Sequence, residues 1–326
     1  MKQVLETISI IGASGFIGRH LVDRLARVSM FRVKVLLRAG LNKQDRVFGA
    51  GIEVIFGDLE RPESLLGFLE PGCTVVNLVY LWGAGEAANL TLTRQLIDAC
   101  DAARVGRLIH CSTAAVVGRV PDMWVNENVR CQPVTEYGIT KLKIEQAFQE
   151  AAKGRFDLAI LRPTSVFGPE GDPLKKLARD LVGGKRVFNY LKSCLFGKRR
   201  MNLIHVENVV AAIEFLVRHD ENCCGQIFNV SDDDDEANNF SDVEAVLMDV
   251  FDLRDYRNSN LNLPLEFLTL LLWLMGRNNV NPKCNYDVDK LLKLGFVRPV
   301  TLMEGLKNYG RWYRSAHHSQ SEQQAG

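Results

Sequence analysis

The chain has 326 residues, of which 47% are hydrophobic and 24% charged, and its formal net charge is +1. This composition is typical of a globular protein with a sizeable core, and the length fits one large domain or two ordinary ones. The near-neutral charge argues against a nucleic-acid partner, because such proteins carry a basic surface. The eight cysteines include no Cys-x-x-Cys pair, which favours reduced thiols and a cytoplasmic location over a disulfide framework.

An apolar run at the N-terminus, residues 4–11, leads directly into a glycine-rich turn and leaves no room for a signal peptide. Gly12, Gly15 and Gly18 have a GxxGxxG spacing, and an amphipathic helical pattern follows them. Glycines so placed let the backbone turn sharply after a strand, approach a pyrophosphate and pack a helix against the sheet. The free N–H groups at the start of that helix attract phosphate. The segment predicts a dinucleotide site formed by Gly12, Ser14, Gly15, Phe16, Ile17 and Gly18.

Strand-like and helix-like patterns alternate through the first half of the chain. Strands are predicted at 4–11, 32–38, 52–56, 74–79, 107–111 and 158–161, and helices at 15–28, 62–69, 85–103 and 134–152. Alternating units with nearly continuous apolar strands predict an α/β fold, a Rossmann-type doubly wound parallel sheet covered by helices on both faces. Ligands then bind at the carboxyl ends of the strands.

After residue 163 the pattern is looser, with many Pro, Gly and charged residues up to 202. A strand at 203–206, a helix to about 217, a strand at 227–230 and mainly helices from 236 are predicted. The acidic run 232–236 is expected to be a solvated loop and no metal site, because no His or Cys accompanies it. The apolar segment 263–275 is shorter than the roughly 20 residues that a membrane span needs. It predicts a buried or lid helix, with a surface for a membrane or an apolar substrate as the alternative.

A catalytic pair is predicted at the start of the helix 134–152. Tyr137 and Lys141 are four residues apart, so they stand one helical turn apart on the same face. A tyrosine with a pKa near 10 is a poor base at neutral pH. A neighbouring ammonium and an oxidised nicotinamide would lower that pKa. The hydroxyls of Ser112 and Thr113 follow a predicted strand and reach the same edge of the sheet, where one could bond a substrate carbonyl or alcohol.

Several short motifs follow one another along the chain. They are 12–18, Gly57-Asp58-Leu59, Cys111-Ser112-Thr113 with Gly118, Tyr137 with Lys141, Arg162-Pro163 with Gly168-Pro169, and Ile204 to Asn208. In this order and spacing they resemble the extended short-chain dehydrogenase/reductase family. The similarity is to its NAD-dependent epimerase/dehydratase group, which acts on nucleotide sugars, and it covers nearly the whole chain.

The resemblance implies a role for each matching residue. Tyr137 would be the acid/base, Lys141 would also bind the nicotinamide ribose, and Thr113 would polarise the reacting C–O group, with Ser112 as the neighbouring candidate. Asp58, followed by Leu59, would contact the adenine. We expect a dinucleotide-binding domain at 1–163 plus 203–232 and a smaller, mainly helical substrate domain at 164–202 plus 233–326. The resemblance also implies a homodimer through the helices at 85–103 and 134–152.

Departures from the family pattern bear on the cofactor and the substrate. Arg38 ends the second predicted strand, where many NAD enzymes have an acid, and its planar guanidinium suits a 2′-phosphate, so NADP is favoured over NAD. Ser165 stands where many nucleotide-sugar enzymes have an asparagine near the substrate phosphates. Arg199 and Arg200 are predicted to neutralise a substrate diphosphate, although they lie one residue out of step with the arginine expected there.

The sequence therefore predicts a nucleotide-sugar epimerase or 4-ketoreductase. A 4,6-dehydratase is less expected, because Thr113 is followed by two alanines in place of an acidic pair. An NADPH-dependent reductase or dehydrogenase of a non-sugar ketone, sterol-like or phenolic, is the first alternative, supported by the apolar residues 267–275 and by Ser165. A non-catalytic NADPH-binding scaffold is the second, although the chain keeps both Tyr137 and Lys141.

Overall fold

The computed structural model describes residues 6–38, 48–49, 51–65, 67–184, 186–256, 263–268 and 281–324, without the side chains of 62 and 317–324. The chain divides into two compact units, each described by itself below. The first unit comprises 1–118, 130–163 and 209–228, and the second comprises 119–129, 164–208 and 229–326. Relative to the predicted domain boundaries, residues 119–129, 203–208 and 229–232 belong to the second unit.

A seven-stranded sheet forms the centre of the first unit, with the strand order β10-β7-β5-β4-β1-β2-β3. Its strands are β1 (Glu6–Ile11), β2 (Phe31–Leu37), β3 (Ile52–Phe56), β4 (Thr74–Asn77), β5 (Arg107–Cys111), β7 (Asp157–Pro163) and β10 (Gln226–Val230). Neighbours from β3 to β7 pair in parallel. This arrangement confirms the predicted doubly wound α/β fold, in which the strand order reverses beside β1.

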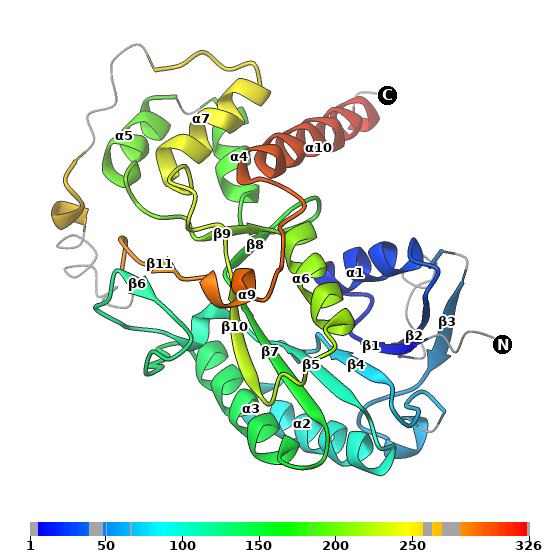
Figure 1. Cartoon of the computed structure of the whole chain (residues 1–326). Helices are drawn as coiled ribbons and strands as arrows, with labels where there is room; N and C mark the ends of the chain where they lie inside the picture. Colours follow the sequence, from blue (N-terminus) through cyan, green and yellow to red (C-terminus); the bar gives the residue numbers. More distant parts are fainter. Residues whose placement is uncertain are drawn as a thin grey trace. The chain divides into compact units, whose positions relative to one another are not determined.

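Helices cover both faces of this sheet (Figure 1). On one face lie α2 (Gly85–Ala102) and α3 (Glu136–Ala152), and on the other lie α1 (Phe16–Ala26) and most of α6 (Val206–Arg218). The strands are apolar because both faces are buried, and Phe68, Phe148 and Leu158 are fully enclosed in the core beneath α2 and α3. α3 begins at a capping residue, since the Thr135 side chain accepts a hydrogen bond from the Gly138 amide.

Two predicted elements of this unit differ from the structure. The helix expected at 62–69 is wrong, because only a short 3₁₀ helix at Pro62–Leu65 forms among the described residues of that segment. The strand expected at 74–79 ends at Asn77, whose side-chain oxygen accepts the Val79 amide. A backbone amide that bonds to a side chain is lost to the sheet ladder, so the chain leaves the sheet after Asn77 and continues past its carboxyl edge.

The second unit combines short strands with helices. Its elements are β6 (Trp124–Val125), β8 (Ser165–Phe167), α4 (Lys175–Val182), α5 (Arg186–Phe196), β9 (Leu203–His205), α7 (Phe240–Val250), β11 (Asn285–Tyr286), α9 (Asp289–Lys293) and α10 (Leu302–Gln324). β8 pairs with β9, and β6 pairs with β11. Phe167, Leu247 and Tyr309 are buried in the core that α4, α7 and α10 share. No helix within the described ranges is long and apolar enough to cross a membrane, and the apolar segment 263–275 is described only as far as Leu268.

The acidic run that begins at Asp232 is only partly the solvated loop that the sequence suggested, since Asp234 and Glu236 are exposed. Asp232 and Asp233 are buried, and the Arg298 guanidinium donates to the carboxylates of Asp232 and Asp234. Burial raises the pKa of Asp232 to about 6, because a charged carboxylate is poorly solvated there. The run instead joins β10 to the helices that follow within the second unit.

Candidate active site

The glycine turn between β1 and α1 is formed by backbone alone. Gly12 has a φ of +89°, which few residues with a side chain adopt, and its carbonyl accepts the Gly15 amide at 3.1 Å. A Cβ on Gly18 would lie 2.2 Å from that same carbonyl oxygen. No side chain caps the start of α1, so its first N–H groups are available to an anion.

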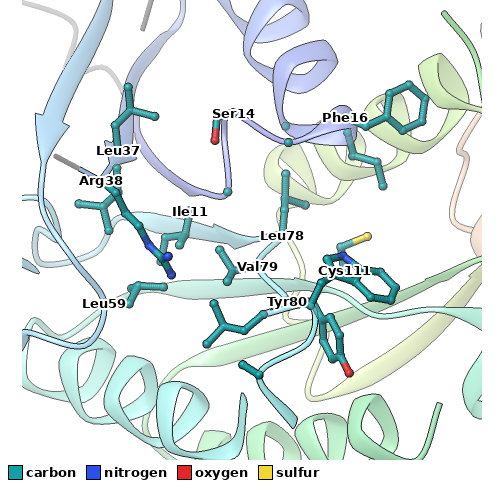
Figure 2. Close-up of a pocket in the computed structure, with 18 of the residues that line it drawn as sticks. Ile11, Ser14, Phe16, Leu37, Arg38, Leu59, Leu78, Val79, Tyr80 and Cys111 are labelled. Atoms are coloured by element: carbon teal, nitrogen blue, oxygen red, sulfur yellow. The ribbon is translucent and has the colours of Figure 1, made fainter. Parts of the chain in front are cut away.

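A cavity of about 830 Å³ opens at this turn, along the carboxyl ends of the central strands. Figure 2 shows part of its wall. Its lining comes entirely from the first unit: the turn, the ends of β2 to β5 and the start of α3. Among the predicted cofactor residues, it is lined by Gly12, Ser14, Gly15, Phe16, Ile17, Gly18, Arg38, Leu59, Tyr137 and Lys141.

Of the two residues expected near the adenine, Arg38 lines the cavity and Asp58 does not. Arg38 extends into the cavity, with its guanidinium near Leu59 (Figure 2). Asp58 does not line the cavity, and its carboxylate accepts the Glu60 amide at 3.1 Å. Leu59 and Glu60 form the wall at this point, so the motif after β3 shapes the pocket while the Asp58 side chain holds the turn.

Lys141 lies at the opposite end of the cavity and is buried. Its Nζ donates to the Cys111 carbonyl at 2.9 Å, and burial lowers its pKa. One turn further along α3, the buried Glu145 carboxylate pairs with Arg162 of β7 at 2.6 Å. The bidentate Arg162–Glu145 pair holds α3 against the sheet, and Lys141 is fixed at the end of β5 as a result.

The state of Tyr137 differs from the sequence-based expectation. Burial raises the pKa of this phenol to about 12, and only the interaction with the Thr113 hydroxyl lowers it. The Lys141 ammonium alone therefore does not lower this pKa, and the expectation also invoked an oxidised nicotinamide. The ammonium is engaged with the Cys111 carbonyl, and the low-polarity surroundings disfavour a phenolate. With its pKa raised, Tyr137 is a phenol at neutral pH.

Two aromatic side chains that the sequence analysis did not single out enclose Tyr137. The Trp82 ring stacks on it at 4.8 Å with an interplanar angle of 18°, and Tyr80 meets it edge-on at 4.8 Å. Both residues line the cavity, yet Trp82 is 74% exposed. Their position directly after β4 was the available signal, because ligands of such sheets bind where the strands end.

The two hydroxyls after β5 have separate roles in the structure. Ser112 lines the cavity, and its buried Oγ has no hydrogen-bond partner among the described residues. Thr113 does not line the cavity, accepts the Ala115 amide at 3.2 Å and interacts with the Tyr137 phenol. A buried hydroxyl without a partner is costly, so Ser112 is the hydroxyl that a ligand in this cavity would satisfy.

The predicted substrate residues lie in the second unit. Ser165 begins β8. Arg200 donates to the backbone carbonyls of Asp233, Asp235 and Glu236 and so holds that loop. Arg199 is half-buried, and this burial lowers the pKa of its guanidinium. Among the described residues Arg200 holds backbone carbonyls, whereas no ion pair is found for Arg199.

Comparison with known proteins identifies the family of the chain. Residues 8–231 match the sequence model of the NAD dependent epimerase/dehydratase family. An N-acetyl-α-D-glucosaminyl-diphospho-ditrans,octacis-undecaprenol 4-epimerase of Escherichia coli O157:H7 is 27% identical, over 92% of this chain and 93% of its own length. A 4-hydroxy-2-methyl-3-oxo-4-farnesyl-3,4-dihydroquinoline-1-oxide ketoreductase of Stigmatella aurantiaca is 28% identical, and the match spans 61% of each protein.

Solved structures show the same fold. The UDP-glucuronic acid 4-epimerase of Bacillus cereus, solved in complex with NAD, matches with a TM-score of 0.71 at 20% identity. The match covers 96% of this chain and 98% of the epimerase.

Proposed function

The chain belongs to the NAD dependent epimerase/dehydratase family, and we propose that it is a nucleotide-sugar epimerase or 4-ketoreductase with Tyr137 as its acid/base. One observation carries this proposal. Tyr137, Lys141 and the Ser112 hydroxyl line one end of a cavity that continues past the glycine turn to Arg38. A dinucleotide that lies along the cavity has its phosphates at the turn and its reactive ring beside the phenol. The 4-epimerase relative, which matches nearly end to end, supports the substrate class.

The residues of the cavity fit a nicotinamide dinucleotide. The absence of a Cβ at Gly18 lets α1 start directly against the Gly12 carbonyl, the start of α1 is uncapped, and the Arg38 guanidinium points into the cavity. When bound, the cofactor accepts a hydride from the substrate or supplies one to it. Arg38 favours NADP, because a guanidinium binds a 2′-phosphate through charge-assisted hydrogen bonds.

The proton transfer falls to Tyr137 in both versions of the reaction. A protonated phenol is the form needed to donate to a ketone oxygen, and the raised pKa keeps Tyr137 in that form. To remove a proton from a substrate hydroxyl, the pKa must first fall, which a positive charge in the cavity would bring about. Ser112 would hold the reacting oxygen, and Thr113 would orient the phenol. This assignment gives Ser112 the role that the family resemblance implies for Thr113.

Arg199 is the residue of the second unit that we propose for the substrate's anionic part. A half-buried guanidinium with no carboxylate partner among the described residues gains from a charge-assisted hydrogen bond to a phosphate. We propose no such role for Arg200, whose donors hold the loop at 233–236. A homodimer through α2 and α3 and a cytoplasmic location remain predictions.

A ketone without a sugar is the second candidate substrate. Tyr80 and Trp82 make the catalytic end of the cavity aromatic, and flat apolar rings pack well against such surfaces. The ketoreductase relative acts on a farnesyl dihydroquinoline oxide, as its name states. In this version Tyr137 keeps its role as the proton donor, and Arg199 has none.

The test is to denature the purified protein, identify any released cofactor, and assay the native protein on a panel of nucleotide sugars and apolar ketones. Tightly held NAD with interconversion of sugar epimers supports the epimerase. A protein that releases no cofactor but oxidises added NADPH in the presence of a keto sugar supports the 4-ketoreductase. Turnover of apolar ketones and of no nucleotide sugar supports the second candidate, a ketone without a sugar. Cofactor binding without turnover of any panel member would contradict the proposal that the protein is an enzyme and would favour a non-catalytic NADPH-binding scaffold.

A further inference from the structure

The helix α5 has its apolar and polar faces reversed relative to an ordinary surface helix. Val187, Phe188 and Leu191 are 75%, 55% and 59% exposed, and their spacing of three and four residues places them on one face. The buried face of α5 carries Asn189, Ser193 and Cys194. A surface helix normally turns its apolar stripe inward, so the outward stripe of α5 is suited to an apolar environment outside the protein.

The exposed apolar surface continues on both sides of this stripe. Val182, at the end of α4, is 56% exposed, and α4 packs against α5. At the other end, the Leu263 amide donates to the Cys194 carbonyl of α5 at 2.9 Å. Leu263 and Phe267 are themselves exposed, and the segment that they begin is apolar in sequence as far as residue 275. Together these residues form one apolar patch, Val182, Val187, Phe188, Leu191, Leu263 and Phe267.

Basic side chains are in excess on the two helices that carry the stripe and Val182. α4 and α5 have Lys175, Lys176, Arg179, Arg186 and Lys192 and a single acid, Asp180. Asp180 is already paired with Lys192, whose ammonium also lies over the Phe188 ring at 4.5 Å. Lys176 and Arg179 project into solvent from α4. An apolar stripe flanked by excess positive charge is the pattern of a helix that lies in the interface of an anionic bilayer.

We propose that the apolar patch on α5 docks this protein onto an anionic lipid surface. Val187, Phe188 and Leu191 would enter the boundary between headgroups and acyl chains, and the basic residues of α4 and α5 would contact the lipid phosphates. The chain would lie on the membrane without crossing it. A second copy of this chain is a less suitable occupant, because two patches with the same positive charge repel each other.

The experiment is flotation of the full-length protein with vesicles, in the absence of any substrate. Wild-type protein should float with vesicles of phosphatidylcholine containing about one-third phosphatidylglycerol, and much less with phosphatidylcholine alone. The triple variant Val187→Ser, Phe188→Ser, Leu191→Ser should lower the bound fraction by at least about tenfold. Lys176→Gln with Arg179→Gln should lower it by about fivefold per removed charge. About 0.5 M salt should weaken binding, since the Debye length is then only a few ångström.

Val297→Ser is the matched control, because Val297 is 80% exposed in the same unit but lies outside the patch. It should float like the wild type, and thermal melting should show all variants to be folded. The proposal fails if wild-type protein floats with neither kind of vesicle, or if Val297→Ser loses as much binding as the triple variant. It fails equally if the triple variant changes only the oligomeric mass in light scattering, which would make the patch an interface between copies. None of these results depends on which substrate the cavity takes.

Discussion

Two parts of the cavity in the first unit are constructed in different ways. The glycine turn is made of backbone, and Gly18 already lies against the Gly12 carbonyl. The Tyr137 end is made of side chains, and its half-buried phenol stacks on Trp82 and has a raised pKa. A binding site made from backbone can be preformed, whereas the ionisation of a partly buried side chain depends on the charges that come near it. Four predictions test this contrast.

The largest effect should come from Gly18→Ala. Its Cβ would lie 2.2 Å from the Gly12 oxygen and 2.8 Å from the Ala13 Cα, so the turn must open. We expect loss of measurable dinucleotide binding in calorimetry, and a free energy of unfolding lower by about 2–3 kcal/mol in urea titrations. Gly49→Ala meets nothing within 4 Å and serves as the control. Wild-type affinity in Gly18→Ala would show that the turn is not preformed around this glycine.

The second effect is on turnover. Tyr137→Phe removes only a hydroxyl, so dinucleotide affinity should be unchanged while kcat falls by about 10²–10⁴-fold, the usual contribution of a general acid–base. Tyr80→Phe is the matched control, because it removes a hydroxyl from the ring that meets Tyr137 edge-on. It should retain most of the activity. Equal losses in the two variants would remove Tyr137 from the acid/base role.

The third effect separates the two nicotinamide cofactors. Arg38→Asp should weaken NADPH binding by about tenfold or more, because a hydrogen bond to a charged group is worth about 1.5–3 kcal/mol. NADH binding should change little. Arg27→Asp makes the same charge change at the far end of α1 and should leave the ratio of the two affinities unaltered. If NADPH and NADH weaken equally in Arg38→Asp, this residue does not contact the 2′ position.

The smallest effect concerns the ionisation of Tyr137 in the protein without ligand. With a pKa of about 12, the difference in ultraviolet absorbance between wild type and Tyr137→Phe should show no tyrosinate below about pH 10, the pKa of a free tyrosine. Trp82→Ala admits water to one face of the ring, so the pKa should fall toward that value. A tyrosinate signal near neutral pH in the ligand-free protein would contradict the enclosed-phenol description.

The local sequence determined the parts of the molecule that rest on backbone geometry and on periodicity. The glycine turn, the alternation of strands and helices and the resulting parallel sheet could all be predicted, because each depends on neighbours within a few residues. Tyr137 and Lys141 could be placed on one helix face for the same reason.

The tertiary structure alone decided what surrounds each of these residues. Trp82 stacks on a side chain 55 positions along the chain, Asp232 is buried where a solvated loop was expected, and α5 turns its apolar face outward. Burial and pKa are set by contacts between residues far apart in sequence, and a low-polarity environment can outweigh the charge of a near neighbour. The sequence therefore determined which residues come together at the cavity, and long-range packing decided how far each of them is buried.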